Sequence, residues 1–168
     1  MIEIRKGTKE DMDAFLALLA HVSGTMEHKE WFYLDTPEEF REMMDGGLMK
    51  LWAAMDGNQM VGAFDALIPG YEDFNYGYDL NLPRQELLRV INMDTAAVHP
   101  NYRGMGLQRR LMQTAEKELT DGSGKILLCT VHPENKYSLN NVLSQGYEIQ
   151  ATMPMYGSIR HILRKDVR

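Results

Sequence analysis

A glycine-rich turn stands immediately before a helix-patterned stretch in residues 98–112, which read VHPNYRGMGLQRRLM. Glycine lets the backbone come close to an anion, and the first N–H groups of a helix attract negative charge. The turn therefore predicts a phosphate site. It matches neither common nucleotide motif, because GxxxxGK(S/T) is absent and Arg109 stands where GxGxxG needs its third glycine. A turn with a purely structural role is the alternative.

The tripeptide Val-His-Pro occurs twice, at 98–100 and 131–133, each time at the end of a strand-like segment. Proline has no N–H to donate and biases the preceding residue towards extended backbone, so strand pairing should stop at both sites. If these strands are neighbours and part there, backbone groups around 97–98 and 130–131 need other partners. An extended ligand that carries amides could supply them. The alternative is that both prolines merely end strands.

These two features together favour one kind of ligand. Its diphosphate would lie against the glycine turn, and its amide-bearing arm would lie between the parted strands. Coenzyme A has this form. We therefore expect the chain to bind coenzyme A through backbone groups at the end of a strand and at the start of the helix that follows.

Hydrophobic periodicity, capping residues and turns predict the elements that would position these residues. Strands are predicted at residues 2–5, 48–55, 59–68, 90–98, 126–131, 147–153 and 158–163. Helices are predicted from Thr8 to near Gly24, from Thr36 to Gly46, from the glycine turn to Gly122, and over 134–144, with a helical turn at 84–88. A helix separates the strands at 90–98 and 126–131, so these two should form a parallel pair.

Length and composition limit the class of protein. A chain of 168 residues with 44% hydrophobic and 25% charged residues suits one globular domain over 1–168. No apolar run approaches the roughly 18 residues that cross a membrane, so no membrane contact is expected. The net charge of −6 argues against nucleic-acid binding, which relies on a positive surface. A charged N-terminus and a lone Cys129 favour a cytoplasmic setting.

Two segments resemble the GNAT superfamily of acyl-CoA-dependent N-acetyltransferases. The family signature, Gln/Arg-x-x-Gly-x-Gly/Ala after a strand, is similar to residues 103–108, and the family's Asn-x-x-Ala…Gly-Phe segment is similar to Asn135, Ser138, Gly146 and Tyr147. The resemblance covers about residues 91–147, whereas the first 60 residues match only in the order of elements. It implies an α/β (α+β) fold with one mixed sheet, splayed at its centre, and helices on both faces.

The resemblance also implies roles for individual residues. The backbone of Ala97 and Val98 would pair with the pantetheine arm of coenzyme A, and Asn135 would hydrogen-bond that arm from the other side. Arg109 or Arg110 would reach a further phosphate, unless these arginines are simply solvated. The diphosphate would be wrapped by Arg103, Gly104, Met105, Gly106, Leu107 and Gln108.

Two positions depart from the family pattern. Gln108 stands where the signature ends in a small residue, so its side chain must point away from the phosphates or the turn must open. Val142 stands seven residues after Asn135, where the family often has a tyrosine that protonates the departing thiolate. Valine cannot donate a proton, so water or Ser138 would have to serve. Tyr147 matches a buried aromatic of the family and is expected in the core.

The implied reaction is direct attack by a neutral amine on the acyl carbonyl, whose oxygen would be held by a backbone N–H near Val98. A protonated amine is not a nucleophile, so a base is required. Asp94 lies four residues before Val98, where the family commonly has such a carboxylate, and we expect it to be catalytic. Its alternative role is to cap a backbone group or order water. Ser138 is expected near the thioester, with an ordinary helix-surface serine as the alternative.

Two acidic and aromatic segments, at 24–35 and 70–79, could hold the acceptor, because carboxylates and ring faces attract a cationic amine. Plain solvated covers are the alternative. The histidines show no HxH or HExxH spacing, so no metal is expected, and His99 and His132 are interpreted as turn residues. The acceptor could be a small molecule or a peptide. The sequence leaves the oligomeric state open, a homodimer included.

The sequence therefore predicts an N-acetyltransferase that moves the acetyl group of acetyl-CoA directly to a primary amine. A non-catalytic acyl-CoA sensor with the same fold is the alternative, and Val142 is the residue that favours it. A third hypothesis is a structural or partner-binding domain whose cleft is disused.

Overall fold

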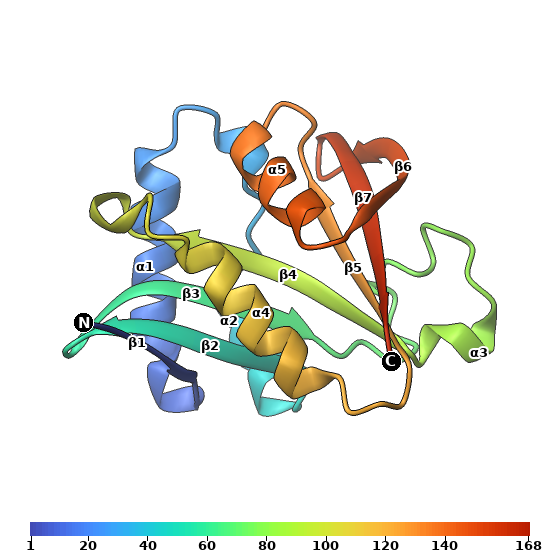
Figure 1. Cartoon of the computed structure of the whole chain (residues 1–168), viewed down its shortest axis with the longest axis horizontal. Coiled ribbons are helices and arrows are strands. Elements are labelled where there is room, and N and C mark those ends of the chain that lie inside the picture. Colours follow the sequence, from blue (N-terminus) through green and yellow to red (C-terminus); the bar gives the residue numbers. More distant parts are fainter.

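The computed structural model describes all residues, 1–168, as one seven-stranded sheet with helices packed on it (Figure 1). The strands are β1 (Ile2–Lys6), β2 (Met49–Asp56), β3 (Gln59–Leu67), β4 (Val90–Val98), β5 (Lys125–Val131), β6 (Glu148–Met155) and β7 (Ser158–Val167). The α-helices are α1 (Met12–Thr25), α2 (Pro37–Asp45), α3 (Arg84–Leu87), α4 (Leu107–Leu119) and α5 (Lys136–Ser144). Short 3-10 helices are η1 (Lys9–Asp11), η2 (Lys29–Trp31) and η3 (Pro100–Tyr102).

The sheet has the strand order β1-β2-β3-β4-β5-β7-β6, and β4 and β5 are its parallel pair. All other neighbours run antiparallel, so the sheet is mixed as predicted. Helix α4 is the crossover between β4 and β5, as the order of predicted elements required. None of the helices combines the length and the apolar composition that crossing a bilayer requires.

Apolar clusters lie on both faces of the sheet. On one face, α4 contributes Leu107 and Leu111 and α5 contributes Val142 to the larger cluster. On the other face, Phe15 of α1 and Phe40 of α2 meet edge to face, with 5.2 Å between ring centroids. Figure 1 shows α4 and α5 in front of the sheet and α1 and α2 behind it. The α/β fold with a mixed sheet and helices on both faces is confirmed.

Most predicted boundaries agree with the structure to within a few residues. Gly57, with φ of 60°, forms the predicted hairpin between β2 and β3. Helix α5 begins at Lys136 and not at Glu134, because Asn135 is its N-cap. Strand β7 continues past the predicted end at residue 163, because its far end pairs with the start of β5, Val167 opposite Lys125.

The expected gap between β4 and β5 is present and is longer than the prolines predict. The two strands pair only over residues 90–92 and 126–128. Beyond these, β4 stays paired with β3 as far as Val98, and β5 stays paired with β7 as far as Val131. The prediction that the strands part at the prolines was therefore wrong in position. A bulge in β4 at Asp94 bends and twists the strand, so the separation begins before either proline.

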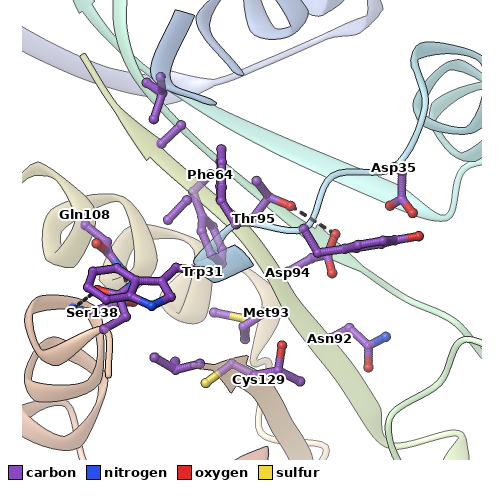
Figure 2. Close-up of a pocket in the computed structure, with 18 of the residues that line it drawn as sticks. Trp31, Asp35, Phe64, Asn92, Met93, Asp94, Thr95, Gln108, Cys129 and Ser138 are labelled. Carbon is purple, nitrogen blue, oxygen red and sulfur yellow. Dashed lines mark hydrogen bonds between the residues drawn. The ribbon is translucent and has the colours of Figure 1, made fainter. Parts of the chain in front are cut away.

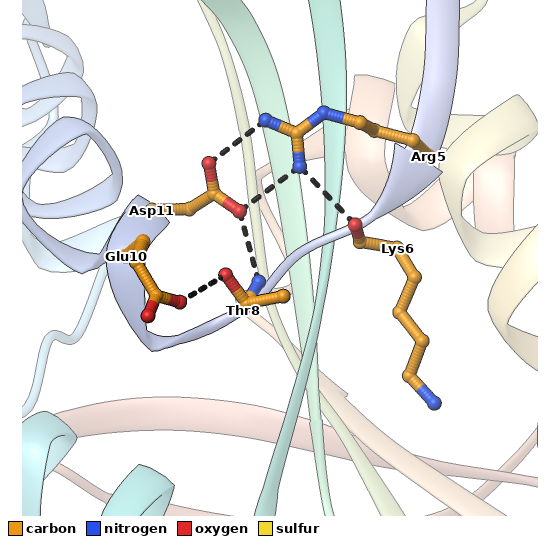
Figure 3. A network of polar contacts seen from close by, with 5 residues as sticks. All are labelled: Arg5, Lys6, Thr8, Glu10 and Asp11. Atoms are coloured by element: carbon orange, nitrogen blue, oxygen red, sulfur yellow. Dashed lines mark hydrogen bonds and ion pairs between the residues drawn. The ribbon is translucent and has the colours of Figure 1, made fainter.

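A polar network fixes the N-terminal end of α1 (Figure 3). The carboxylate of Asp11 accepts the N–H of Thr8 at 2.8 Å and pairs with both terminal nitrogens of Arg5, at 2.8 and 2.9 Å. The hydrogen bond from Arg5 lowers the pKa of Asp11. The network ties the end of β1 to the start of the helical segment, so the apolar side of α1 is held against the sheet.

We predict that Asp11→Ala lowers the free energy of unfolding by about 1–2 kcal/mol, because it removes a helix-cap acceptor and a bidentate pair with Arg5. Urea denaturation at pH 7 measures this loss. Asp13→Ala is the matched control, since Asp13 is 90% exposed where it meets Arg41 and should cost about 0.5 kcal/mol or less. Equal losses in the two variants would contradict a special role for the Asp11 network.

Candidate active site

A cleft of about 1260 Å³ lies where β4 and β5 part (Figure 2). Its floor includes residues 92–98 of β4 and 129–131 of β5. One wall comes from α4 and α5, and the other comes from the chain around η2 and from the loop before α3. In Figure 2, Gln108 and Ser138 lie to the left of β4 and Asp35 lies to its right. The gap between the strands thus opens into a cavity that reaches both faces of the sheet.

The turn between β4 and α4 has the backbone that only glycine adopts without strain. Gly104 has φ of 82° and Gly106 has φ of 69°, and a Cβ on either would meet no atom within 4 Å. Gly106 is the N-cap of α4, so the first N–H groups from Leu107 onward have no partner within the helix. Open glycines beside free helical N–H groups form the geometry of an anion site.

Side chains of α4 and α5 meet beside this turn. The amide of Gln108 donates from Nε2 to the hydroxyl of Ser138 at 3.2 Å, as Figure 2 shows. The Oδ1 of Asn135 accepts the N–H of Ser138 at 3.4 Å and so caps α5. Gln108 therefore points towards α5 and leaves the amides at the start of α4 uncovered, which is the first of the two arrangements that the sequence allowed.

The structure gathers most of the predicted site residues in the wall of the cleft, namely Asp94, Ala97, Val98, Arg103, Gly104, Leu107, Gln108, Asn135 and Ser138. Met105, Gly106 and Arg109 lie outside the cleft wall. Met105 is 49% exposed. Arg109 contacts the hydroxyl of Ser144 on α5, so its guanidinium is directed to that helix.

The two Val-His-Pro segments share one local structure. The Nδ1 of His99 accepts the N–H of Asn101 at 3.1 Å, and the Nδ1 of His132 accepts the N–H of Glu134 at 3.1 Å. Both histidines are turn residues, as predicted. The structure contains no group of three or more His, Cys, Asp or Glu side chains placed to hold a metal ion.

Asp94 is the extra residue of the bulge in β4. Thr95 pairs with Asp65 and Met93 pairs with the next residue of β3, so Asp94 has no partner across the ladder. Its Oδ1 accepts the hydroxyl of Tyr76 at 3.2 Å, and its Oδ2 accepts the hydroxyl of Thr95 at 3.2 Å. The bulge therefore directs this carboxylate into the cleft, half-buried and held by two hydroxyls.

Both acidic and aromatic segments of the sequence line the cleft. The segment 24–35 contributes Trp31 and Tyr33, and the segment 70–79 contributes Phe74 and Tyr76. The carboxylates around the cleft are Glu27, Asp35, Glu39, Glu42, Glu72, Asp73 and Asp94. Tertiary structure thus places acidic groups from four separate stretches of chain around one opening.

The chain matches the family model of the acetyltransferase (GNAT) family over residues 23–147. It belongs to the GNAT family of acetyltransferases. The matched range contains α4, α5 and most of the cleft wall. A search of curated proteins gave no significant match.

Solved structures of GNAT proteins have the same fold. A GNAT-family acetyltransferase from Streptococcus pneumoniae is 15% identical, with a TM-score of 0.74 over 100% of both chains. The ribosomal-protein-S18-alanine N-acetyltransferase from Escherichia coli is 16% identical, with a TM-score of 0.72 over 99% of this chain and 94% of that one. Arabidopsis thaliana NAA60, solved in complex with acetyl-CoA, is 16% identical, with a TM-score of 0.72 over 99% of both chains.

This GNAT protein has an apolar residue at the position where the resemblance to the family predicts a general acid. Val142 is buried and lines the cleft beside α4. Tyr147 is 3% exposed and belongs to the same apolar cluster as Leu111, so its assignment to the core is confirmed. Tyr137 lines the cleft but is 64% exposed. The hydroxyls close to the carboxylate of Asp94 come from other segments.

Two cleft residues of the β6–β7 hairpin were not predicted from the sequence. Tyr156 lies at the turn and lines the cleft, and Arg160 is 7% exposed in β7. The guanidinium of Arg160 donates to the side chain and carbonyl of Thr130, at 2.9 and 3.2 Å, and to the carbonyl of Trp31 at 3.3 Å. Burial lowers its pKa. Because side chains alternate along a strand, Arg160 lies on the same face as Ile162, which is buried. An arginine at such a position was the sequence signal for a buried polar role.

Three carboxyl groups in or next to the cleft of this acetyltransferase have raised pKa values. Burial, with a smaller contribution from the charge of Asp35, raises the pKa of Asp94 to about 7, against the hydrogen bonds from Thr95 and Tyr76. Asp65 is fully buried, and burial and the charge of Asp94 raise its pKa well above the usual range. Burial and the charge of Glu39 raise the pKa of Asp35. The cleft therefore holds one carboxyl that titrates near neutral pH, and a fully buried neighbour outside the cleft wall also has a raised pKa.

We predict that Asp94→Asn stabilises the protein at pH 8 and that this gain shrinks towards pH 4. The folded chain binds the Asp94 proton more tightly than the unfolded chain, in which the pKa is 3.8, so wild-type stability falls as pH rises from about 4 to about 7. Asparagine cannot ionise and removes this loss. Urea denaturation of both proteins from pH 4 to pH 8 measures the difference, and a constant difference across that range would contradict the raised pKa.

Proposed function

We propose that this GNAT protein transfers the acetyl group of acetyl-CoA directly to a primary amine. The observation that carries the proposal is the edge of β4 beyond Asn92, which no longer pairs with β5 and is followed along the chain by η3, the glycine turn and the free N–H groups at the start of α4. A strand edge that has lost its partner needs hydrogen bonds from another source. A long ligand with amides at one end and a diphosphate at the other satisfies both parts of this surface.

The residues of this chain fit coenzyme A. The backbone of Ala97 and Val98 would pair with the amides of the arm, and Asn135 would contact the arm from α5. The turn at Gly104 and Gly106 would receive the diphosphate. The structure of NAA60 in complex with acetyl-CoA supports this choice of ligand for the fold. Acetyl-CoA would supply an acetyl group activated as a thioester.

The acceptor would approach from the opposite wall, where the carboxylates lie. The acidic groups and the ring faces of Tyr33 and Phe74 favour a cationic amine over a neutral or anionic acceptor. A peptide N-terminus and a small-molecule amine both meet this requirement. The Escherichia coli neighbour is an N-acetyltransferase of a ribosomal-protein alanine, which supports a peptide acceptor for the fold in general.

Asp94 would act as the general base. Its carboxylate lies at the bulge, between the strand edge proposed for the coenzyme and the acidic wall proposed for the acceptor. A base works best when its pKa lies near the working pH, and the pKa of Asp94 is about 7. Asp94 would take a proton from the incoming ammonium group, while Tyr76 and Thr95 hold the carboxylate in place.

Thiol release from acetyl-CoA, measured with a chromogenic disulfide and a panel of amines and peptides, tests the proposal directly. We expect at least one cationic amine to raise the release of free thiol well above the rate without amine. If coenzyme A binds and no acceptor raises thiol release, the enzyme proposal is wrong and the non-catalytic sensor, favoured by Val142, takes its place.

We predict that Gly106→Val weakens the binding of coenzyme A by about tenfold or more. A side chain at this position would occupy the open space in front of α4 and strain a left-handed backbone, so the helical N–H groups would be less accessible. Isothermal titration calorimetry measures the affinity. Gly122→Val is the matched control, because it has φ of 85° at the far end of α4 and the same open surroundings. Equal losses would count against the proposed diphosphate site.

We predict that Asp94→Asn lowers kcat/KM by about 10²–10⁴-fold at neutral pH. In the wild type the rate should rise with pH through about 7 as Asp94 ionises, and this limb should be absent from the variant. At high pH a larger fraction of the free amine is already neutral, so the defect should shrink. A pH–rate profile of each protein provides the measurement, and a defect of the same size at every pH would remove Asp94 from the role of base.

A further inference from the structure

Three side-chain oxygens form a row from the floor of the cleft to its rim. The hydroxyl of Tyr76 donates to Oδ1 of Asp94 at 3.2 Å, and the hydroxyl of Tyr156 lies 2.9 Å from that of Tyr76. Tyr76 is 6% exposed, whereas Tyr156 is 42% exposed. The row therefore links a half-buried carboxylate to solvent through the protein.

The middle of the row is held from both sides by buried amides. Asn92 of β4 accepts the N–H of Tyr76 at 3.3 Å and donates to the carbonyl of Phe74 at 2.9 Å. Asn75 donates to the carbonyls of Gly70 and Leu87, at 2.8 and 3.0 Å. Asn75 and Asn92 are both within 1% of complete burial. These bonds fix the loop against β4, so the hydroxyl of Tyr76 has a defined position beside Asp94.

The outer end of the row is fixed by stacking. The ring of Tyr156 lies 3.9 Å from the ring of Tyr33, with 8° between the planes. The guanidinium of Arg160 lies 5.9 Å from the ring centroid of Tyr156. Burial raises the pKa of Tyr156 to about 12, so its hydroxyl keeps its proton at neutral pH and can donate it. Tyr156 thus presents a protonated hydroxyl at a fixed place on the rim.

The proposed reaction needs a path by which Asp94 can pass its proton to solvent. Balanced for a protonated acceptor, it reads R–NH₃⁺ + CH₃CO–S–CoA → R–NH–COCH₃ + HS–CoA + H⁺. One proton per turnover must reach solvent, and Asp94 must lose the proton it has taken before the next cycle. With coenzyme between the strands and acceptor against the opposite wall, both sides of the cleft are filled. A path through hydroxyl groups of the cleft wall does not require water between the two ligands.

We propose that Tyr76 and Tyr156 carry the proton from Asp94 to solvent. The O–H bond of the Asp94 carboxyl breaks as its proton moves to the oxygen of Tyr76, Tyr76 releases its own proton to Tyr156, and Tyr156 releases its own to water. Both tyrosines are neutral before and after, and Asp94 returns to its carboxylate form. Only O–H bonds form and break, so no other reactant is needed. The inference rests on the proposed acetyl transfer.

Other titratable and charged groups lie around the row, and they set its pH dependence. The groups that act on Asp94 or on the two tyrosines are Asp35, Asp65 and Arg160, with Tyr33 stacked on Tyr156. The hydrogen bond from Tyr76 lowers the pKa of Asp94. Removing the Tyr76 hydroxyl should therefore move the acid limb of the pH–rate profile to higher pH, whereas removing the Tyr156 hydroxyl should leave that limb nearly in place.

The test uses full-length protein with an amine that supports thiol release, and compares Tyr76→Phe, Tyr156→Phe and the double variant. Each single change should lower kcat by about tenfold or more with little change in KM for acetyl-CoA. The double variant should cost no more than the worse single, because both changes break one path. Tyr78→Phe is the matched control in the same loop, since that hydroxyl donates to the carbonyl of Tyr71 at 2.8 Å and does not line the cleft.

Buffer rescue separates proton transfer from a structural role. In Tyr156→Phe, raising the concentration of imidazole at constant pH and ionic strength should restore much of kcat, because a small base can take the proton that the tyrosine no longer carries. Wild-type kcat should not respond. Additive losses in the double variant, or absence of rescue, would overturn the relay while acetyl transfer stands. No amine-dependent thiol release in the wild type would overturn both proposals together.

Discussion

The site depends on one irregularity of the backbone, the bulge of β4 at Asp94. Because Thr95 and Met93 pair with consecutive residues of β3, the strand bends and leaves β5 after Asn92. Asp65 supports the bulge by accepting the N–H of Thr95 at 3.0 Å from a fully buried position. One extra residue thus separates the central strands, frees a strand edge and directs a carboxylate into the resulting cleft.

Because the central strands separate, a ligand in the cleft can contact both faces of the sheet, and the two faces offer different chemical groups. On the face of α4 and α5, the groups available to a ligand are backbone amides, glycine turns and small polar side chains. On the face of α1 and α2, they are carboxylates and aromatic rings. The wall of carboxylates would repel an anionic coenzyme, and the wall of free helical N–H groups would repel a cationic acceptor. This division of charge therefore favours one orientation of the two substrates.

Burial sets the proton chemistry of the centre. Asp94 lies between the solvent in the cleft and the core beneath it, and its two hydroxyl partners only partly offset the cost of its charge, so its pKa is about 7. Val142 stands where the resemblance to the family predicts a tyrosine, whereas Tyr76 and Tyr156 bring hydroxyls to Asp94 from a loop and a hairpin. The hydroxyls nearest Asp94 therefore lie on the side of the sheet where we propose that the acceptor binds.

The sequence alone determined the elements and the glycine turn of the proposed coenzyme site, because both rest on local rules. Glycines at 104 and 106, the N-cap at Thr36 and the alternation of the strands depend on neighbours a few residues away. Only the tertiary structure decided where β4 leaves β5, which acids gather around the cleft, and that Tyr156 and Arg160 line it. These features join residues up to 129 positions apart, as in the hydrogen bond from Arg160 to the carbonyl of Trp31, and no local sequence pattern indicates such a contact.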